Sequence, residues 1–174
     1  MYNQLKDEVR TLVDEIFPEI ISIRRDFHRH PELSEHEERT ARMICRYLSQ
    51  WGIEYRDNIG GHGIVGRIDG KLHAPAGRRY EAVAIRADMD ALPIEEAVES
   101  PFKSENYGIM HACGHDGHIA GLLGAASILK EMECKDTQKT GRQVLRFSQA
   151  LLPACRRDCR RSSPDDRRWL YERS

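Results

Sequence analysis

The apolar residues between positions 5 and 27 recur at the three- and four-residue spacing of one helix face. A proline at position 18 interrupts this stretch. Because proline lacks a backbone N–H and clashes with the preceding turn, Pro18 predicts a kink or the start of a fresh helix. The residues on this face are Leu5, Val9, Leu12, Val13, Ile16, Ile20, Ile23 and Phe27.

A second helix is predicted after residue 34. Ser34 and Glu37 have the spacing of a capping box, in which two side chains satisfy free N–H groups at a helix start. Gly52 stands where a glycine commonly ends a helix. The apolar face between them consists of Ala41, Ile44, Cys45, Leu48 and Trp51.

Beyond residue 60 the pattern changes to short apolar runs. Residues 64–68 follow a glycine-rich turn and predict a strand, and 144–147 predict another. The continuous run at 82–85 is typical of a strand buried on both faces of a parallel sheet. A helix is predicted over 116–132, and helices followed by strands alternating with a helix indicate an α/β fold. The apolar side of that helix consists of Ile119, Leu122, Leu123, Ala126 and Leu129.

The composition is that of one globular domain. The 174 residues are 40% hydrophobic and 32% charged, which argues against wholesale disorder. The net charge of −1 argues against a nucleic-acid binder, and no stretch approaches the ~18–20 apolar residues of a membrane span. The charged N-terminus lacks the apolar core of a signal peptide, so we expect a cytoplasmic protein. In that reducing compartment the five cysteines are expected to be thiols or ligands.

Residues 142–174 differ in composition from the rest of the chain. They contain nine arginines and no lysine, and beyond Ala154 they show neither a helical nor a strand period. One interpretation is a solvated, disordered tail. Another is an RNA-binding tail.

Two acidic residues, Asp88 and Asp90, directly follow the predicted strand at 82–85. Ligands of open α/β sheets bind beyond the carboxyl ends of strands, so carboxylates at this position are candidates for a site. The alternative is that they only cap the turn between strand and loop. Position alone does not separate these interpretations.

A denser cluster, HACGHDGH, occupies residues 111–118. It holds three histidines, a cysteine and an aspartate, which are ligand types that zinc-like metals prefer. Its glycines at 114 and 117 would let the backbone turn so that neighbouring side chains converge. Cys113 could instead be a nucleophile with His111 or His115 as its base. The density of the cluster favours the metal site.

Three segments together resemble the aminoacylase/carboxypeptidase metallopeptidases of peptidase family M20, most closely the amidohydrolase branch. They are IRRDFHRHPELSEHEERTA at 23–41, AIRADMDALPIEE at 84–96 and MHACGHDGHIAGLLGAA at 110–126. The segments stand in the family's order, and the resemblance covers about residues 5–135. Several long motifs coincide, so the signal is far more specific than one short pattern.

The resemblance implies the N-terminal part of a two-metal, aminopeptidase-like catalytic domain, with a mostly parallel central sheet flanked by helices and with the lid domain absent. Carried over by position, Cys113 and His115 are metal ligands, and Asp90 orients the site from behind them. Asp88 lies near it with a role left open, and His118 supports the loop.

The same resemblance implies two divalent ions (zinc, manganese, cobalt or nickel) and a small-molecule N-acyl amino acid or related amide as substrate. It implies a homodimer for the full-length family, and no nucleic-acid or membrane partner. In the family, two metals polarise the amide carbonyl and activate a bridging water, and a glutamate acts as general base and then acid.

That glutamate is missing where it is expected. The family carries it in a Phe-Gln-Pro-Ala-Glu-Glu segment, but this chain reads SQALLPACRRDCRR after the predicted strand at 144–147. Codons allowed for residues 151–158, read one base later, spell Cys-Phe-Gln-Pro-Ala-Glu-Glu. We therefore predict a frameshift near or before residue 150, which gives a third interpretation of the arginine-rich tail.

The chain is thus expected to have two parts: residues 1–141 as the N-terminal part of a metallohydrolase catalytic domain, and 142–174 as a strand remnant and shifted tail. Its family function is hydrolysis of an amide by a metal-activated water, in which this chain is expected to be impaired. The alternative is a small non-catalytic metal-binding protein that uses the His/Cys cluster. Uncovered apolar surface predicts poor solubility.

Overall fold

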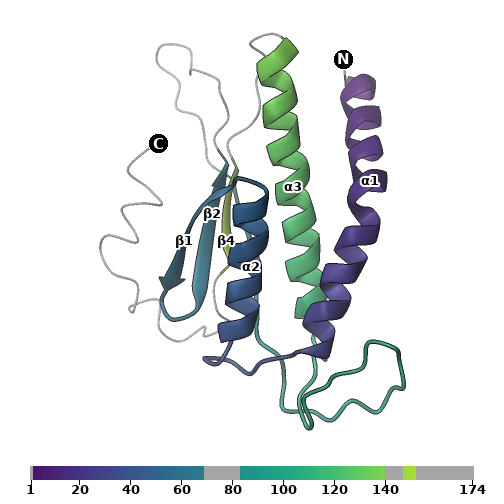
Figure 1. Cartoon of the computed structure of the whole chain (residues 1–174), viewed down its shortest axis with the longest axis vertical. Helices are drawn as coiled ribbons and strands as arrows, with labels where there is room; N and C mark the ends of the chain where they lie inside the picture. Colours follow the sequence, from purple (N-terminus) through teal and green to yellow (C-terminus); the bar gives the residue numbers. More distant parts are fainter. Residues whose placement is uncertain (1, 69–82, 140–146, 152–174) are drawn as a thin grey trace.

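The computed structural model describes residues 2–68, 83–139 and 147–151. These residues form an α/β fold in which helices α2 and α3 contact a four-stranded sheet and α1 packs on α3 (Figure 1). The predicted α/β class is therefore confirmed. The elements are α1 (Tyr2–Arg29), α2 (Glu38–Gln50), β1 (Glu54–Ile59), β2 (Gly63–Ile68), β3 (Val83–Ala87), α3 (His115–Lys139) and β4 (Phe147–Leu151).

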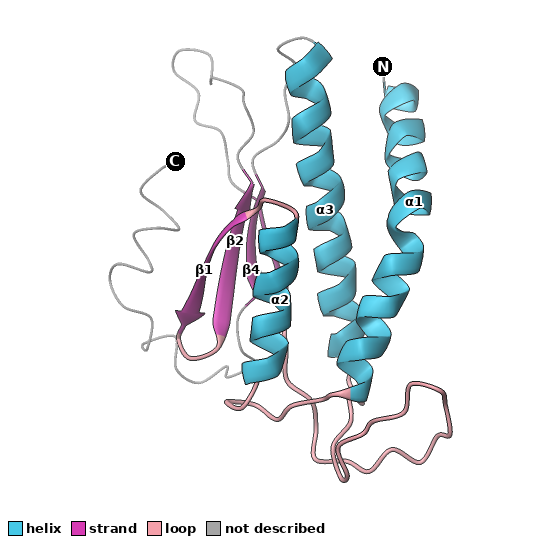
Figure 2. Cartoon of the chain, in the orientation of Figure 1, coloured by secondary structure: helices cyan, strands magenta, loops and turns pink. Residues whose placement is uncertain are grey.

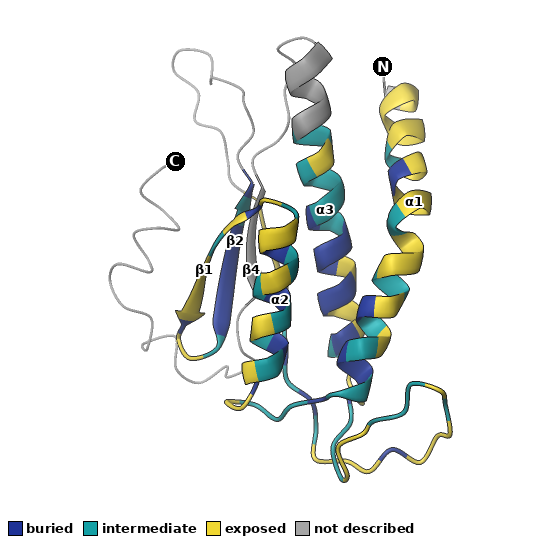
Figure 3. Ribbon diagram, in the orientation of Figure 1, coloured by how far each residue is buried: buried dark blue, intermediate teal, exposed yellow. Residues whose placement is uncertain are grey.

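Helix α1 runs through Pro18 as one element, so no fresh helix starts there. Only part of its predicted apolar face is buried. Ile23 and Phe27 are enclosed, whereas Leu5 and Val13 are exposed. Figure 3 shows that burial of α1 concentrates toward its C-terminal end, beside the start of α3. Packing against α3, and not periodicity alone, decides which apolar residues are covered.

The predicted capping box of α2 is wrong. The helix begins after Glu37, whose side chain makes no capping hydrogen bond, so Ser34 is not the N-cap. The carboxylate of Glu32 takes that role, because it accepts hydrogen bonds from the backbone N–H groups of Arg39 (3.0 Å) and Thr40 (2.7 Å). A carboxylate from outside the motif satisfies these donors equally well.

The end of α2 is the predicted one. Gly52 adopts a φ of +64°, in the left-handed region that favours glycine. Its N–H donates to the carbonyl of Ser49, and the N–H of Ile53 donates to that of Leu48. These two bonds are the Schellman pattern that closes a helix.

The described sheet is mixed, with the strand order β1-β2-β4-β3. The pairs β1–β2 and β2–β4 are antiparallel, and β3–β4 is parallel. The predicted mostly parallel sheet is thus not confirmed for the described strands. The reason is local: Gly60 and Gly61 both have positive φ angles and join β1 to β2 as a tight hairpin, which is necessarily antiparallel.

Strand β3 is not buried on both faces, contrary to the prediction. It is an edge strand of the described sheet, and Val83 and Ile85 are 47% and 38% exposed. Strand β1 was not predicted, since its sequence EYRDNI is mostly polar. Of the strand predicted at 144–147, only Phe147 is described, and it is the first residue of β4; 144–146 lie outside the described residues. The tail at 152–174 also lies outside them.

The hydrophobic core lies between the sheet and helices α2 and α3, where Figure 3 shows β2 and the middle of α3 in dark blue. The predicted apolar side of α3 is confirmed apart from the partly buried Leu129. Among the described helices, none is both long and apolar enough to cross a membrane. The largest buried apolar side chains are Phe27, Ile23, Ile44, Leu48, Ile64, Met89, Ile119, Leu123 and Val65.

Candidate metal site

The three segments that carry the family motifs meet at one end of the molecule, where the loops gather (Figure 2). The N–H of Ala91 donates to the carbonyl of Glu32 (2.7 Å), which joins the second segment to the first. Leu92 and Met110 exchange two backbone hydrogen bonds of 3.0 and 3.1 Å, which join it to the third. The backbone therefore holds the acidic loop beside residues 110–118, here called the metal loop.

The metal loop turns at Gly114, whose φ is +76° and whose N–H donates to the carbonyl of His111 (3.0 Å). The carbonyl of Gly114 in turn accepts from the N–H groups of Gly117 and His118, which starts α3. The predicted role of Gly114 as a turn residue is confirmed. Gly117 does not share it, because it lies within the first turn of α3.

His115 is oriented by Asp90. Its Nδ1–H lies 2.9 Å from Asp90 Oδ1 and 2.9 Å from the Asp90 carbonyl oxygen, and both of these atoms are acceptors. The side chains are 18% and 13% exposed. Since Nδ1 carries the proton, Nε2 keeps its lone pair, which is the arrangement of a histidine held for metal binding by a carboxylate.

Asp88 makes a different contact. Its Oδ1 accepts from Nε (2.8 Å) and Nη2 (2.7 Å) of Arg86, at the end of β3. This pair is consistent with the interpretation that Asp88 only closes the turn after the strand. The carboxylate of Asp90 instead accepts a hydrogen bond from His115, so the two predicted acidic residues have separate partners.

Cys113 is a free, exposed thiol on the metal loop. His118 is also exposed, and its ring lies 6.0 Å from that of His115. Within the described part of the chain, no three His, Cys, Asp or Glu side chains are gathered closely enough to hold a metal ion. The ligand roles of Cys113 and His115 therefore stay a prediction, and these two candidates do not by themselves form a closed site.

A buried polar network lies behind the metal loop. His28 of α1 places Nδ1 2.7 Å from Oδ2 of Asp116 and Nε2 3.1 Å from Oε1 of Glu96. Arg24 Nε lies 2.8 Å from the same oxygen of Asp116. The N–H of Ser104 donates to Glu96 Oε2 (2.6 Å). The sequence gives no sign of a role for His28 or Glu96, because their partners are remote in the chain.

Two opposed effects set the pKa of Glu96. Burial disfavours its charged form, but the hydrogen bonds from Ser104 and His28, with the nearby positive charge of Lys103, outweigh it. The pKa of the Glu96 carboxyl is therefore lowered. An ionised carboxylate at this position suits a network centred on an imidazole.

His111 is buried, and neither ring nitrogen has a hydrogen-bond partner. Burial lowers its pKa to about 4, against the opposing attraction of Asp116. The ring is thus neutral at pH 7. An enclosed imidazole with so low a pKa is a weak base for the exposed thiol of Cys113, so the nucleophile alternative gains no support from this residue.

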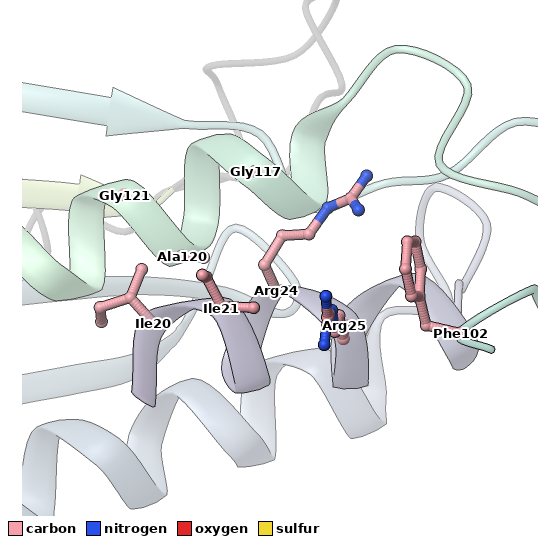
Figure 4. A pocket seen from close by; sticks show the side chains of 8 residues that line it. All are labelled: Ile20, Ile21, Arg24, Arg25, Phe102, Gly117, Ala120 and Gly121. Atoms are coloured by element: carbon pink, nitrogen blue, oxygen red, sulfur yellow. The ribbon is translucent and has the colours of Figure 1, made fainter. Parts of the chain in front are cut away.

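A groove of about 370 Å³ lies between α1 and α3. Figure 4 shows Arg24 and Arg25 of α1 extending beside Phe102, and their guanidinium carbons lie 5.3 and 5.1 Å from its ring centroid. None of the predicted site residues lines this groove, so it is not the candidate site. Its other lining residues are Ile20, Ile21, Gly117, Ala120 and Gly121.

Comparison with known proteins gives consistent matches. Residues 84–149 match the Peptidase family M20/M25/M40. The chain is 41% identical over 148 residues to the N-acyl-L-amino acid amidohydrolase of Geobacillus stearothermophilus, covering 85% of this chain and 38% of that protein. It is 42% identical over 138 residues to the N-acetyl-L-cysteine deacetylase of Bacillus subtilis, covering 75% and 32%.

A solved structure agrees with these relatives. The YXEP protein of Bacillus subtilis, described as a dinuclear metal binding peptidase from the M20 family, is similar with a TM-score of 0.68 and 36% identity. The match covers 81% of this chain and 36% of that one. The chain spans about a third of the length of the curated relatives it matches. The chain therefore belongs to peptidase family M20, a family of metal-dependent hydrolases, and represents part of the length of its amidohydrolase members.

Proposed function

We propose that this chain carries half of the metal site of an amidohydrolase that acts on N-acyl amino acids, with Cys113 and His115 as metal ligands. The observation that carries the proposal is the pair of hydrogen bonds from His115 Nδ1–H to Asp90, which leaves Nε2 free for a metal. The exposed thiol of Cys113, two residues earlier on the same loop, supplies the second ligand. The names of the relatives in Geobacillus and Bacillus support the substrate class.

The donor set fits a divalent ion of the zinc type. A thiolate and an imidazole suit zinc, manganese, cobalt and nickel to different degrees. When bound, such an ion supplies Lewis-acid activation of a water molecule. The residues of this chain have two roles in the site. Asp90 holds the His115 imidazole in one tautomer, and the turn at Gly114 presents the Cys113 thiolate.

The proposal extends to the reading frame. The family match ends at residue 149, just before the segment in which shifted codons would restore Phe-Gln-Pro-Ala-Glu-Glu. In this proposal residues 1–141 are family sequence, and the part of 142–174 beyond about residue 150 is read out of frame. This chain then binds metal without hydrolysing amides, because the general-base glutamate is missing.

A titration with Co²⁺ tests the metal site. A thiolate bound to Co²⁺ gives a sulfur-to-metal charge-transfer band, and substitution of Cys113 shows whether this thiolate supplies it. We expect the wild-type chain to show the band and Cys113→Ser to lose it. Since even supporting residues change metal affinity by about 10- to 100-fold, the loss of a ligand should weaken binding by at least about tenfold. Cys45→Ser is the matched control, because Cys45 is a partly buried thiol of α2.

Two further measurements separate the alternatives. Release of amino acid from N-acetylated substrates should be undetectable with this chain, and turnover would contradict the frameshift. The coding DNA decides the same question, since codons other than those required at 151–158 remove its support. Metal binding in the present frame, with no activity after the frame is restored, would instead favour a non-catalytic metal-binding protein.

A further inference from the structure

The imidazole of His28 contacts both loops that form the candidate site. His28, on α1, contacts Asp116 through Nδ1 (2.7 Å) and Glu96 through Nε2 (3.1 Å). Asp116 directly follows His115 in the first turn of α3, and Glu96 lies on the loop after β3 that also contains Asp90. This loop contacts the metal loop directly through Asp90 and His115, and indirectly through Glu96 and His28, since His28 also contacts Asp116.

The network is buried and charged, so its geometry is tightly constrained. The side chains of His28, Glu96 and Asp116 are 7%, 5% and 0% exposed. Both ring nitrogens of His28 lie within hydrogen-bond distance of carboxylate oxygens, and Arg24 Nη2 also lies 3.4 Å from Nδ1. A buried carboxylate is strongly destabilised if its polar partner is displaced, because water cannot replace that partner.

The network is also anchored from outside. Arg24 Nε donates to Oδ2 of Asp116 at 2.8 Å, and Arg24 lies one turn before His28 on α1. Asp116 is thus held by two residues of α1 at its own helix start. In the described structure these two polar contacts join the first turn of α3 to α1.

We propose that His28 is a positioning residue for the metal loop: through Asp116 it fixes the first turn of α3 and thereby the direction in which His115 presents Nε2 to a metal. The inference rests on the proposed metal site. It assigns the metal-facing geometry to a residue 87 positions away in the sequence, on a helix that contributes no ligand. Glu96 holds the other side of the ring and keeps it in the orientation that serves Asp116.

Three substitutions of His28 separate this role from simple packing. In His28→Asn the side-chain amide nitrogen overlays Nδ1 and keeps the donor to Asp116. In His28→Gln it overlays Nε2 and keeps only the donor to Glu96. His28→Leu keeps neither. The matched control is His30→Asn, since His30 is a partly buried histidine near the end of the same helix that bonds to Asp26.

The readouts are the Co²⁺ dissociation constant, from the Cys113 charge-transfer band, and hydrogen exchange of the backbone amides of 111–118. We expect His28→Leu to weaken Co²⁺ binding about 10- to 100-fold and to speed exchange in the metal loop. His28→Gln should resemble it. His28→Asn should recover most of the affinity and protection, and His30→Asn should match the wild type.

The outcomes are distinct. Equal losses in His28→Asn and His28→Gln, in proportion to thermal stability, would show that His28 only packs. Wild-type affinity in all three variants would overturn the inference while leaving the metal site intact. If the wild-type chain shows no Cys113-dependent band, the proposed metal site is wrong, and the inference for His28 is then wrong as well. Should His28→Leu fail to fold, the Asn and Gln pair still decides the question.

Discussion

Glu37 is a fully buried carboxylate whose two oxygens accept no hydrogen bond of ordinary geometry. Burial raises its pKa, the nearby charge of Asp90 adds to that shift, and His62 opposes it. A raised carboxyl pKa means that the folded state holds the proton more tightly than the unfolded state does. Its stabilising contribution is therefore complete below the ordinary value of 4.5 and is lost as pH rises through the folded-state pKa.

This sign gives a prediction for Glu37→Gln in the metal-free chain. The substitution removes a buried charge, so at pH 7 the free energy of unfolding should increase by about 1–3 kcal/mol. The gain should shrink as pH falls and vanish below pH 4.5, where Glu37 is protonated in both states. Urea unfolding across this pH range measures it, with the exposed Glu38→Gln as control. A loss of stability at pH 7 would mean that the carboxylate has a partner it needs.

At the same scale, the sequence singled out some residues of the candidate site and not others. The types and density of side chains in 111–118 pointed to Cys113 and His115, and the family motif pointed to Asp90. Nothing in the sequence paired His28 with Asp116 or Glu96, because a buried hydrogen bond leaves no periodic signal. Only the fold brings residues 88 and 68 positions apart within hydrogen-bond distance.

Helix α3 shows how packing divides one residue type into two roles. A Cβ at Gly121 would meet no atom within 4 Å, whereas a Cβ at Gly124 would lie 3.1 and 3.2 Å from the Ile20 side chain of α1. Gly124 thus allows close approach of the two helices. Gly121 has no such constraint in the described structure.

The two glycines should respond differently to alanine. Gly121→Ala should raise the free energy of unfolding by about 0.5–1 kcal/mol, because alanine loses less backbone entropy in a helix. Gly124→Ala should lose that gain or destabilise, since Ile20 must shift. In an Ile20→Ala background the Gly124→Ala change should become stabilising. The measurement is thermal unfolding of the wild type, Gly121→Ala, Gly124→Ala, Ile20→Ala and Ile20→Ala/Gly124→Ala. An equal effect of alanine at both glycines would contradict the close-approach role of Gly124.

Elements with strong local signals were predicted well, and those with remote determinants were not. Helix α3 and the glycine that ends α2 follow from residues close together in the chain. The start of α2 did not, because its cap is Glu32 and not Ser34. Strand β1 has a polar sequence, and its pairing with β2 supplies the order that its composition does not.

Across the whole molecule, the mixed sheet is the feature that the sequence misrepresented. The apolar run at β3 predicts a strand buried on both faces. In the described sheet, however, β3 pairs only with β4, and its side chains Val83 and Ile85 are exposed to solvent. Which strand neighbours which depends on pairings across the chain, and burial follows from those neighbours. An uncovered apolar edge strand is a template for association between chains.

Self-association of this chain should therefore proceed through β3. Val83 and Ile85 are 47% and 38% exposed, so Val83→Lys/Ile85→Lys should cost little stability and should prevent edge-to-edge pairing by charge repulsion. The matched control is Leu5→Lys/Val13→Lys on α1, where the exposed fractions are 48% and 39%. Light scattering across a concentration series should show a lower apparent mass for the β3 variant than for the wild type or the control. If both variants reduce association equally, total exposed apolar surface is the cause, because the two pairs match in exposure and only the β3 pair lies on a strand edge.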